Sequence, residues 1–329
     1  MQINNMLKGR SLLRLGDLSE RELLYLLDLA DRLKERKRRG VRGRLLYRRH
    51  IAMIFEKAST RTRCAVAVAA ADEGGHAEYL SAGEIHLGKK ESVADTAKVL
   101  GRMFDGMLFR GYEQKTVELM ATHAGVPVWN GLTDECHPTQ ALADLMTIRE
   151  NFGRLKGLKV VFIGDGRNNV ATSLMVGCAK CGMNFVNCAP PELSPSSGKL
   201  GEAEESARMS GGSVAVLHDP EEAVRGANVV YTDVWVSMGE ENKMTERRRQ
   251  LAPYQVTMDL VRKTGNVESG KVIFLHCLPA FHDNQTEVTR KIGAMEVADD
   301  VFQAPFSKVF DEAENRVHTM KALMVATIP

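Results

Sequence analysis

Apolar residues along the chain fall into two kinds of run, and the two kinds alternate. Leu23 to Leu33 carries apolar side chains at helical spacing behind Ser19, which can cap a helix, so a helix is predicted there. Short continuous apolar runs follow, each predicted to be a buried strand, at intervals long enough for crossover helices. The predicted strands are Ile51–Phe55, Met107–Phe109, Val126–Trp129, Lys159–Ile163, Asn184–Cys188, Val229–Tyr231 and Val272–His276.

Alternation of buried strands and helices is typical of parallel sheets that helices cover on both sides. We therefore predict an α/β fold made of two doubly wound parallel-sheet domains with helices on both faces. The length of 329 residues agrees, because a single core rarely organises more than about 250–300 residues. Polar residues and glycines from 151 to 157 interrupt the pattern. The boundary is predicted there, with a first domain over 1–150 and a second over 151–310.

Composition fits a soluble globular protein. Hydrophobic residues make up 44% of the chain and charged residues 26%, and no stretch approaches the ~20 apolar residues of a membrane span. The first ten residues lack the basic-then-apolar pattern of a secretory signal. Six cysteines without metal-finger spacing fit reduced thiols rather than disulfides or a zinc site. We expect a cytoplasmic protein with no membrane contact and no metal.

One segment, from Arg32 to Arg49, is dense in Lys and Arg although the whole chain carries a net charge of only +2. The sharper interpretation is a basic arm for RNA or anionic lipid. No series of interleaved aromatic residues offers a stacking platform, so a solvated helix end and turn is the favoured interpretation. A nucleic-acid partner is not expected from the sequence.

The strongest local motif is Ser-Thr-Arg-Thr-Arg, which begins at Ser59 just after a predicted strand and opens a predicted helix. In an open α/β sheet, ligands bind at such strand ends. A helix start offers unpaired backbone amides, the hydroxyls of Ser59, Thr60 and Thr62 add donors, and Arg61 supplies a guanidinium fork for phosphate oxygens. The alternative is Ser/Thr capping with a surface arginine, but such a run after an apolar strand is unusual for capping alone. Since the chain has no Walker loop, the expected phosphate is not that of a nucleoside triphosphate.

Two further motifs lie at equivalent positions in the first half. Arg110 ends a predicted strand, and His137-Pro138-Thr139-Gln140 opens the helix that runs through Arg149. A lone His before Pro is more often structural than catalytic. Beside an anion site, however, Arg110 and His137 can polarise a carbonyl oxygen, and Gln140 can then hold an amide nitrogen.

The second half repeats this arrangement with different side chains. Gly164-Asp165-Gly166 resembles a dinucleotide fingerprint only weakly, because Asn169 replaces its third glycine and no acidic residue ends the next strand. Asp233 and Cys277 each follow an apolar strand. Asp233 can pair with an ammonium group, and Cys277 lies where a substrate can reach it. Taken alone, Asp233 would be interpreted as a helix cap and Cys277 as a small core residue.

Taken as a set, these motifs resemble the ornithine carbamoyltransferase family, within the aspartate/ornithine carbamoyltransferase superfamily. The similarity runs through most of the chain. Ser-Thr-Arg-Thr-Arg marks the superfamily, while Ser237-Met238-Gly239 and His276-Cys277-Leu278-Pro279 favour ornithine over aspartate. The segment from Glu314 to Thr319, near the end of the chain, completes the match, and all of these motifs occur in the order found in the family.

The resemblance implies a role for each of these residues. Carbamoyl phosphate would be bound by Ser59, Thr60, Arg61, Thr62, His86, Arg110, His137, Gln140, Cys277, Leu278 and Arg316. Ornithine would be bound by Asn169, Asp233, Ser237 and Met238. The residues with catalytic roles would be Arg110, His137, Cys277 and Arg316. Family members need no metal or organic cofactor.

The resemblance also implies an arrangement in space. Because Arg316 would complete the phosphate site of the first domain, the C-terminal helix over 311–329 should cross back to that domain. His86 lies in a loop that reaches the neighbouring subunit of a trimer in the family, although some relatives carry Gln there. A homotrimer, or a multiple of trimers, is therefore expected.

The implied reaction is direct attack of the neutral δ-amine of L-ornithine on the carbonyl carbon of carbamoyl phosphate. It passes through a tetrahedral intermediate and yields L-citrulline and phosphate. Two routes to the neutral amine are open. Either Cys277 and Asp233 help to remove the ornithine proton, or the enzyme selects the uncharged substrate. The alternative is a paralogous carbamoyltransferase acting on putrescine or another amine.

Overall fold

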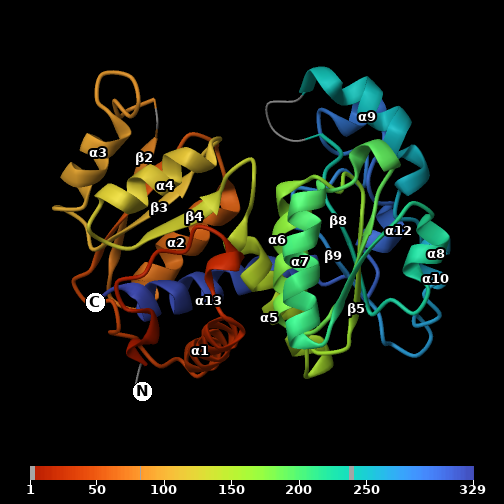
Figure 1. Cartoon of the computed structure of the whole chain (residues 1–329), viewed down its shortest axis with the longest axis horizontal. Coiled ribbons are helices and arrows are strands. Elements are labelled where there is room, and N and C mark those ends of the chain that lie inside the picture. The colour runs from red at the N-terminus through yellow and green to blue at the C-terminus, as the bar shows by residue number, and fades with distance from the viewer. Residues whose placement is uncertain (1–3, 82, 237–240) are drawn as a thin grey trace. The chain divides into compact units, whose positions relative to one another are not determined.

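The computed structural model describes residues 4–81, 83–236 and 241–329. The chain divides into two compact units, Met1–Met146 with Glu314–Pro329 and Thr147–Ala313. Each unit is a parallel sheet with helices packed against it (Figure 1). The predicted α/β class is confirmed, and the last 16 residues belong to the first unit, as predicted for the C-terminal helix.

A four-stranded sheet forms the centre of the first unit. Its strand order is β2-β1-β3-β4, and every neighbouring pair is parallel. The strands are β1 (His50–Phe55), β2 (His76–Ser81), β3 (Gly106–Arg110) and β4 (Val128–Leu132). The helices are α1 (Glu20–Arg38), α2 (Thr60–Asp72), α3 (Val93–Leu100), α4 (Gln114–His123), α5 (Pro138–Phe152) and α13 (Val309–Thr327), of which α5 and α13 continue across the division between the units.

Helices cover both faces of this sheet because successive strand side chains point in opposite directions. Ala52 and Ile54 of β1 belong to a buried cluster that includes Ala97 of α3 and Val117 of α4. The opposite face of the sheet lies toward α1, α2 and α13 (Figure 1). Hydrogen bonds hold α13 against both of its neighbours there, from Lys34 of α1 to Asn315 at 2.7 Å and from Lys321 to Asp72 of α2 at 2.7 Å.

The second unit contains a five-stranded parallel sheet of order β7-β6-β5-β8-β9. The strands are β5 (Lys159–Ile163), β6 (Asn184–Cys188), β7 (Ser213–Leu217), β8 (Val229–Thr232) and β9 (Ile273–Leu275). The helices are α6 (Asn169–Lys180), α7 (Ser197–Ser210), α8 (Pro220–Val224), α9 (Met244–Leu251), α10 (Met258–Arg262), α11 (Thr289–Ile292) and α12 (Asp299–Phe302). Helices α8, α10 and α12 contribute to the buried cluster on one face, and α6 and α7 pack against the sheet and each other.

All seven predicted strands are present, with ends shifted by three residues at most. Two strands, β2 and β7, escaped prediction, and each forms one edge of its sheet. Both are only partly buried, so they lack the continuous apolar run that identified the others. Within the described residues, the helices are too short or too polar to cross a bilayer.

Candidate active site

The first unit places its polar motifs where the strand order reverses. From β1 the chain moves outward to β2 and then returns to β3 on the other side of β1, so the switch point lies between β1 and β3. Phe55 and Arg110 are register partners at the carboxyl ends of these two strands. Ligands of open α/β sheets bind at such points. Ser59 follows β1 and Arg110 ends β3, so the structure brings the two motifs to one edge of the sheet.

Ser59 caps helix α2, which begins at Thr60. Its backbone is extended, and its hydroxyl accepts a hydrogen bond from the backbone N–H of Thr62 at 3.1 Å. The cap uses the Ser59 oxygen as acceptor but leaves the other amides of the first turn directed out of the helix end. This turn therefore presents backbone donors and the positive end of the helix dipole beside Arg61.

Arg316 reaches this turn from α13 and is almost completely buried. Its Nη2 donates to Oγ1 of Thr62 at 3.0 Å, and its Nη1 donates to Oε1 of Gln140. Gln140 lies in the first turn of α5, and its Nε2 donates to Asp144 at 2.8 Å. The guanidinium plane is thus fixed by two side chains, which orients it before any ligand arrives.

His137 directly precedes α5 and is buried next to three arginines. Burial lowers the pKa of His137 well below its ordinary value, and the charges of Arg316, Arg110 and Arg61 lower it further. The imidazole is therefore neutral at neutral pH. A neutral ring in a cationic cluster can donate a hydrogen bond to an oxygen on which negative charge develops, without adding a fourth positive charge.

His86 stands apart from this buried cluster. It lies on the exposed loop between β2 and α3, where the backbone amides of Lys89 and Lys90 donate to its carbonyl at 3.0 and 3.2 Å. The His86 side chain is exposed, whereas Arg110, His137 and Arg316 are each 6% exposed or less.

The second unit has its own switch point, between β5 and β8. The chain runs from β5 through β6 to β7 and then returns to β8 beside β5, with Ile163 and Thr232 in register at the strand ends. Asn168 and Asn169 follow β5, and Asp233 follows β8 directly. Cys277 comes shortly after the neighbouring strand β9. The predicted ornithine residues that the structure describes thus share one sheet edge with Cys277.

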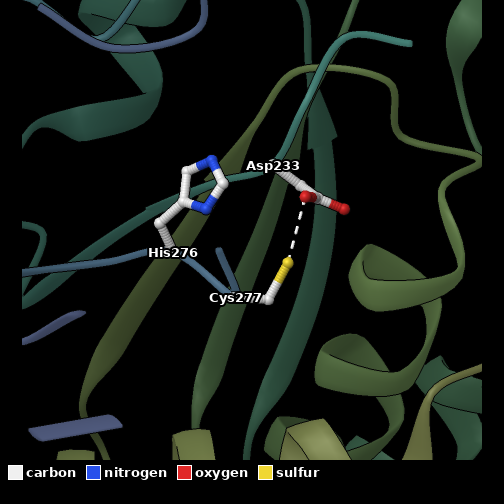
Figure 2. A group of neighbouring side chains, drawn as sticks. All are labelled: Asp233, His276 and Cys277. Carbon is white, nitrogen blue, oxygen red and sulfur yellow. Dashed lines mark hydrogen bonds between the residues drawn. The ribbon is translucent and has the colours of Figure 1, made fainter. Parts of the chain in front are cut away.

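Asp233 is the centre of a hydrogen-bonded group. Its carboxylate accepts from Nδ2 of Asn168 at 2.8 Å and from Sγ of Cys277 at 3.0 Å, and the thiol points at the carboxylate in Figure 2. The backbone N–H of Val234 donates to the same side chain at 2.8 Å. Because Asp233 is buried with donors around it, it is held as an acceptor for positively charged or N–H groups.

A second layer fixes the loop that carries Cys277. Leu278 has a left-handed backbone with φ of 58°, and its N–H donates to Nδ1 of His276 at 2.9 Å. Nε2 of His276 lies 3.1 Å from Glu296, which also accepts from the backbone N–H of Phe281. Burial alone lowers the pKa of His276, but the hydrogen bond and the charge of Glu296 outweigh burial and raise it.

Asp233, His276 and Cys277 also place three atoms capable of binding a metal within 4.8 Å of one another. The two ring nitrogens of His276 are already engaged, Nδ1 as an acceptor from Leu278 and Nε2 toward Glu296. A metal would have to displace one of these bonds to gain the third ligand. The arrangement suits orientation of the loop better than metal binding.

The other predicted ornithine residues are Asn169, Ser237 and Met238. Asn169 opens α6, one position after the Asn168 that bonds Asp233. Ser237 and Met238 lie outside the described residues. The sequence interpretation missed Asn168 and Glu296. Asn168 follows a strand end and precedes a helix, and this position could have identified it. Glu296 lies 20 positions from His276, its partner, and no local pattern marks it.

Comparison with known proteins places these motifs in a family. Residues 10–150 match the family model described as aspartate/ornithine carbamoyltransferase, carbamoyl-P binding domain. Residues 156–327 match the model described as aspartate/ornithine carbamoyltransferase, Asp/Orn binding domain.

Individual relatives extend along nearly the whole chain. A Bacillus licheniformis protein named ornithine carbamoyltransferase, catabolic, is 58% identical, covering 98% of this chain and 97% of its own. The structure of ornithine carbamoyltransferase from Pyrococcus furiosus is 45% identical, with a TM-score of 0.90 and 98% of each chain covered. That of the anabolic enzyme from Campylobacter jejuni is 34% identical, with a TM-score of 0.85, 96% of this chain and 97% of that chain covered. The chain therefore belongs to the aspartate/ornithine carbamoyltransferase family of enzymes.

Proposed function

We propose that this protein is an ornithine carbamoyltransferase, which transfers the carbamoyl group of carbamoyl phosphate to the δ-amine of L-ornithine and releases L-citrulline and phosphate. The observation that carries the proposal is the convergence of Arg61, Arg110, His137 and Arg316 at the switch point of the first unit. The names of the full-length relatives support ornithine as the acceptor. We assign the first unit to carbamoyl phosphate and the second to ornithine, as the two family models suggest.

Carbamoyl phosphate would bind at the first turn of α2. Backbone amides of the turn, the hydroxyls of Ser59, Thr60 and Thr62 and the guanidinium of Arg61 would contact the phosphate oxygens. Arg316 would add a second guanidinium, since its Thr62 contact already directs it to the same turn. Charge on the leaving phosphate grows as the carbon–oxygen bond breaks, so these donors stabilise the transition state more than the bound substrate.

The carbamoyl group would meet a different set of donors. Arg110 and neutral His137 would donate to its carbonyl oxygen, which becomes an oxyanion in the tetrahedral intermediate. Oε1 of Gln140, which accepts from Arg316, would also accept from the carbamoyl NH2, because an amide oxygen has two lone pairs. The resemblance adds Cys277 and Leu278 as contacts of this group, and both assignments stay predictions.

Asp233 would hold an amino group of ornithine, with Asn169, Ser237 and Met238 as further contacts. The δ-amine attacks only as the neutral base, because a protonated amine has no lone pair. Either the Asp233–Cys277 pair removes the proton, or the enzyme binds ornithine already uncharged. The pH dependence of kcat/KM for ornithine in Cys277→Ala separates the two routes, since only the first loses an ionisation with the thiol.

We further propose that the protein assembles as a homotrimer and that His86 acts in the site of the adjacent subunit. The loop that carries His86, Lys89 and Lys90 supports this, because these three side chains are exposed and do not belong to the buried arginine cluster of their own chain. A head-to-tail contact of this kind closes as a ring.

A steady-state assay of carbamoyl transfer with ornithine, putrescine and aspartate as competing acceptors tests the proposed function. Ornithine should give a kcat/KM at least about 100-fold above the other two. Putrescine lacks the carboxylate of ornithine and aspartate lacks its δ-amine, and a site built to pair with a charged group rejects an analogue without it. Putrescine as the preferred acceptor would establish the alternative activity instead. Equal failure of all three acceptors would overturn the assignment.

A further inference from the structure

The amino end of β1 carries a concentration of positive charge that the catalytic chemistry does not use. Residues 32–49 contain ten Lys or Arg and one Glu, a net charge of +9, whereas the whole chain has +2. The remaining residues therefore carry −7, which is +2 minus +9. Eight of the ten cations are arginines. The charge of this segment is opposite in sign to that of the rest of the molecule.

Acidic neighbours neutralise only part of this charge. Lys37 pairs with Asp72 at 2.7 Å, Arg39 with Glu35 at 2.6 Å and Arg49 with Asp105 at 2.7 Å. Arg42, Arg44 and Arg48 are exposed and have no carboxylate within 4.0 Å among residues 4–81, 83–236 and 241–329. Asp72 also holds Lys321. The nearby carboxylates are thus occupied, and three arginines remain available to an external anion.

The loop that presents these arginines is fixed by the end of α2. Glu73 is buried and accepts from the backbone N–H of Leu45 at 3.2 Å, and its carbonyl accepts from Leu46 at 3.0 Å. A Cβ on Gly43 would lie only 1.8 Å from the Glu73 carboxylate, so any other residue here would displace the carboxylate that holds Leu45. The loop is therefore a folded structure, and its arginines have defined positions relative to one another.

An aromatic ring lies among the arginines. Tyr47 is 50% exposed, and the guanidinium carbons of Arg44 and Arg48 lie 4.5 and 5.5 Å from its ring centroid. Arg48 adopts a left-handed backbone with φ of 60°, which few residues other than glycine tolerate. Its N–H donates to the carbonyl of Gly74 at 3.2 Å. The fold thus maintains a strained residue that brings a second arginine to Tyr47.

We propose that Arg42, Arg44, Tyr47 and Arg48 form a binding surface for single-stranded nucleic acid. The arginines would contact backbone phosphates, and the exposed part of the Tyr47 ring would stack on a base. The sequence disfavoured this partner because it showed no series of interleaved aromatic residues. The structure brings Arg44 and Arg48 within 5.5 Å of the half-exposed ring of Tyr47, so the arginines and one aromatic residue form a single surface.

An anionic membrane is the competing partner, and two features favour nucleic acid over it. Arginine outnumbers lysine four to one here, and the planar guanidinium suits bidentate phosphate contacts and stacking. Membrane docking needs apolar side chains that insert, but Val41 and Tyr47 are the only large hydrophobic residues exposed in this described segment.

The surface is separate from the catalytic residues of the same unit. It precedes β1, whereas the Ser59 turn follows β1, and a strand of six residues spans about 20 Å. Substitutions here should leave carbamoyl transfer unchanged, which verifies that each variant is folded.

Fluorescence anisotropy of the intact enzyme with a labelled oligouridylate, longer than the about 16 nucleotides that one single-strand binding fold covers, tests the proposal. Binding should weaken with salt by about 0.7 in log Kd per log salt for each phosphate contacted. The variant R42Q/R44Q/R48Q should bind at least about tenfold more weakly with a smaller salt slope. Tyr47→Leu should weaken binding at least about fivefold while keeping the charge, because one stacked base contributes that much.

A matched control, R208Q/R225Q/R290Q, removes the same charge from exposed positions elsewhere. It should bind within twofold of the unaltered enzyme. Equal weakening in the two triple variants would overturn the proposal, as would full binding by Tyr47→Leu or no binding at about 50 mM salt. Cosedimentation with phosphatidylglycerol vesicles without oligouridylate binding would assign the surface to membranes instead and would also overturn it.

Discussion

Arg316 donates a hydrogen bond from Nη2 to Oγ1 of Thr62, a residue 254 positions earlier in the chain. Both side chains are buried, and the same guanidinium bonds Gln140 at the start of α5. One arginine of the last helix therefore ties together the first turns of α2 and α5. These are the two turns from which the proposed carbamoyl phosphate contacts project.

Arg316→Lys tests this link. Lysine keeps the positive charge but lacks the planar fork from which two separate nitrogens reach Thr62 and Gln140. We expect kcat/KM for carbamoyl phosphate to fall about 100-fold or more, as for loss of one transition-state donor. Steady-state kinetics provide the measurement, and circular dichroism checks the fold. A loss below tenfold would mean that charge alone, and not the bidentate geometry, is what Arg316 contributes.

Arg61→Ala should nearly abolish turnover and leave the fold intact. Arg61 is partly exposed in the first turn of α2, so truncation opens no core cavity, but it removes a charge-assisted contact to the leaving phosphate. Isothermal titration with carbamoyl phosphate and single-turnover rates measure the two effects. Arg63→Ala, two positions further along and exposed, is the matched control. Near-normal kcat/KM in folded Arg61→Ala would contradict the phosphate assignment.

The limits of prediction from sequence follow from burial. Central strands such as β5 are covered on both faces and read as continuous apolar runs, so they were predicted with correct ends. Edge strands β2 and β7 have exposed and partly buried positions in turn, and their polar residues resemble a connecting segment. The strand order that creates the two switch points was not predicted, because periodicity describes each strand alone and does not specify its neighbours.

The residues of the candidate site likewise differ in how far the sequence could identify them. Motifs contiguous in sequence, such as the Ser59 turn, are visible without a structure because strand, cap and arginine follow one another. Contacts such as Arg316 with Thr62 depend on tertiary packing, and the role of Arg316 came from family resemblance. Glu296, which contacts His276, gave no local signal at all.

Asp233→Ala should weaken ornithine selectively. Its carboxylate belongs to the second unit and accepts from Asn168 and Cys277, so its loss removes a partner for an ammonium group and leaves the Ser59 turn untouched. KM for ornithine should rise at least about tenfold, in line with loss of a hydrogen bond to a charged group. Calorimetry should give an unchanged Kd for carbamoyl phosphate. Equal weakening of both ligands would show that Asp233 is structural.

Stability should fall in mild acid because of His318. Burial lowers the pKa of this imidazole from its ordinary 6.5 to about 4, although its hydrogen bond to the Glu314 carboxylate acts in the opposite direction. The unfolded chain binds the proton more readily, so the stabilising contribution is complete above pH 6.5 and is lost as pH falls toward 4. The full window corresponds to about 3 kcal/mol of unfolding free energy.

Urea unfolding between pH 7.5 and about 5 measures this slope, and the lower limit keeps Glu314 ionised. His318→Gln should flatten the pH dependence relative to the unaltered protein. Contributions of other groups, including buried His137, are common to both proteins and cancel in the comparison. His76→Gln alters an exposed histidine and should leave the slope unchanged. Parallel slopes for the His318 variant and the unaltered protein would contradict the buried neutral imidazole.

Complementation between defective subunits tests the proposed action of His86 across an interface. Arg110→Ala removes a buried cation of the first unit, and His86→Ala removes an exposed side chain of the loop after β2. If each site combines Arg110 of one subunit with His86 of its neighbour, trimers mixed from the two variants contain some sites in which both residues are intact. After joint unfolding and reassembly, activity should exceed that of either parent. Each parent unfolded and reassembled alone is the control. A site confined to one subunit cannot regain function by exchange of neighbours. If both parents are impaired and verified mixed trimers show no gain, His86 therefore acts within its own chain or not at all.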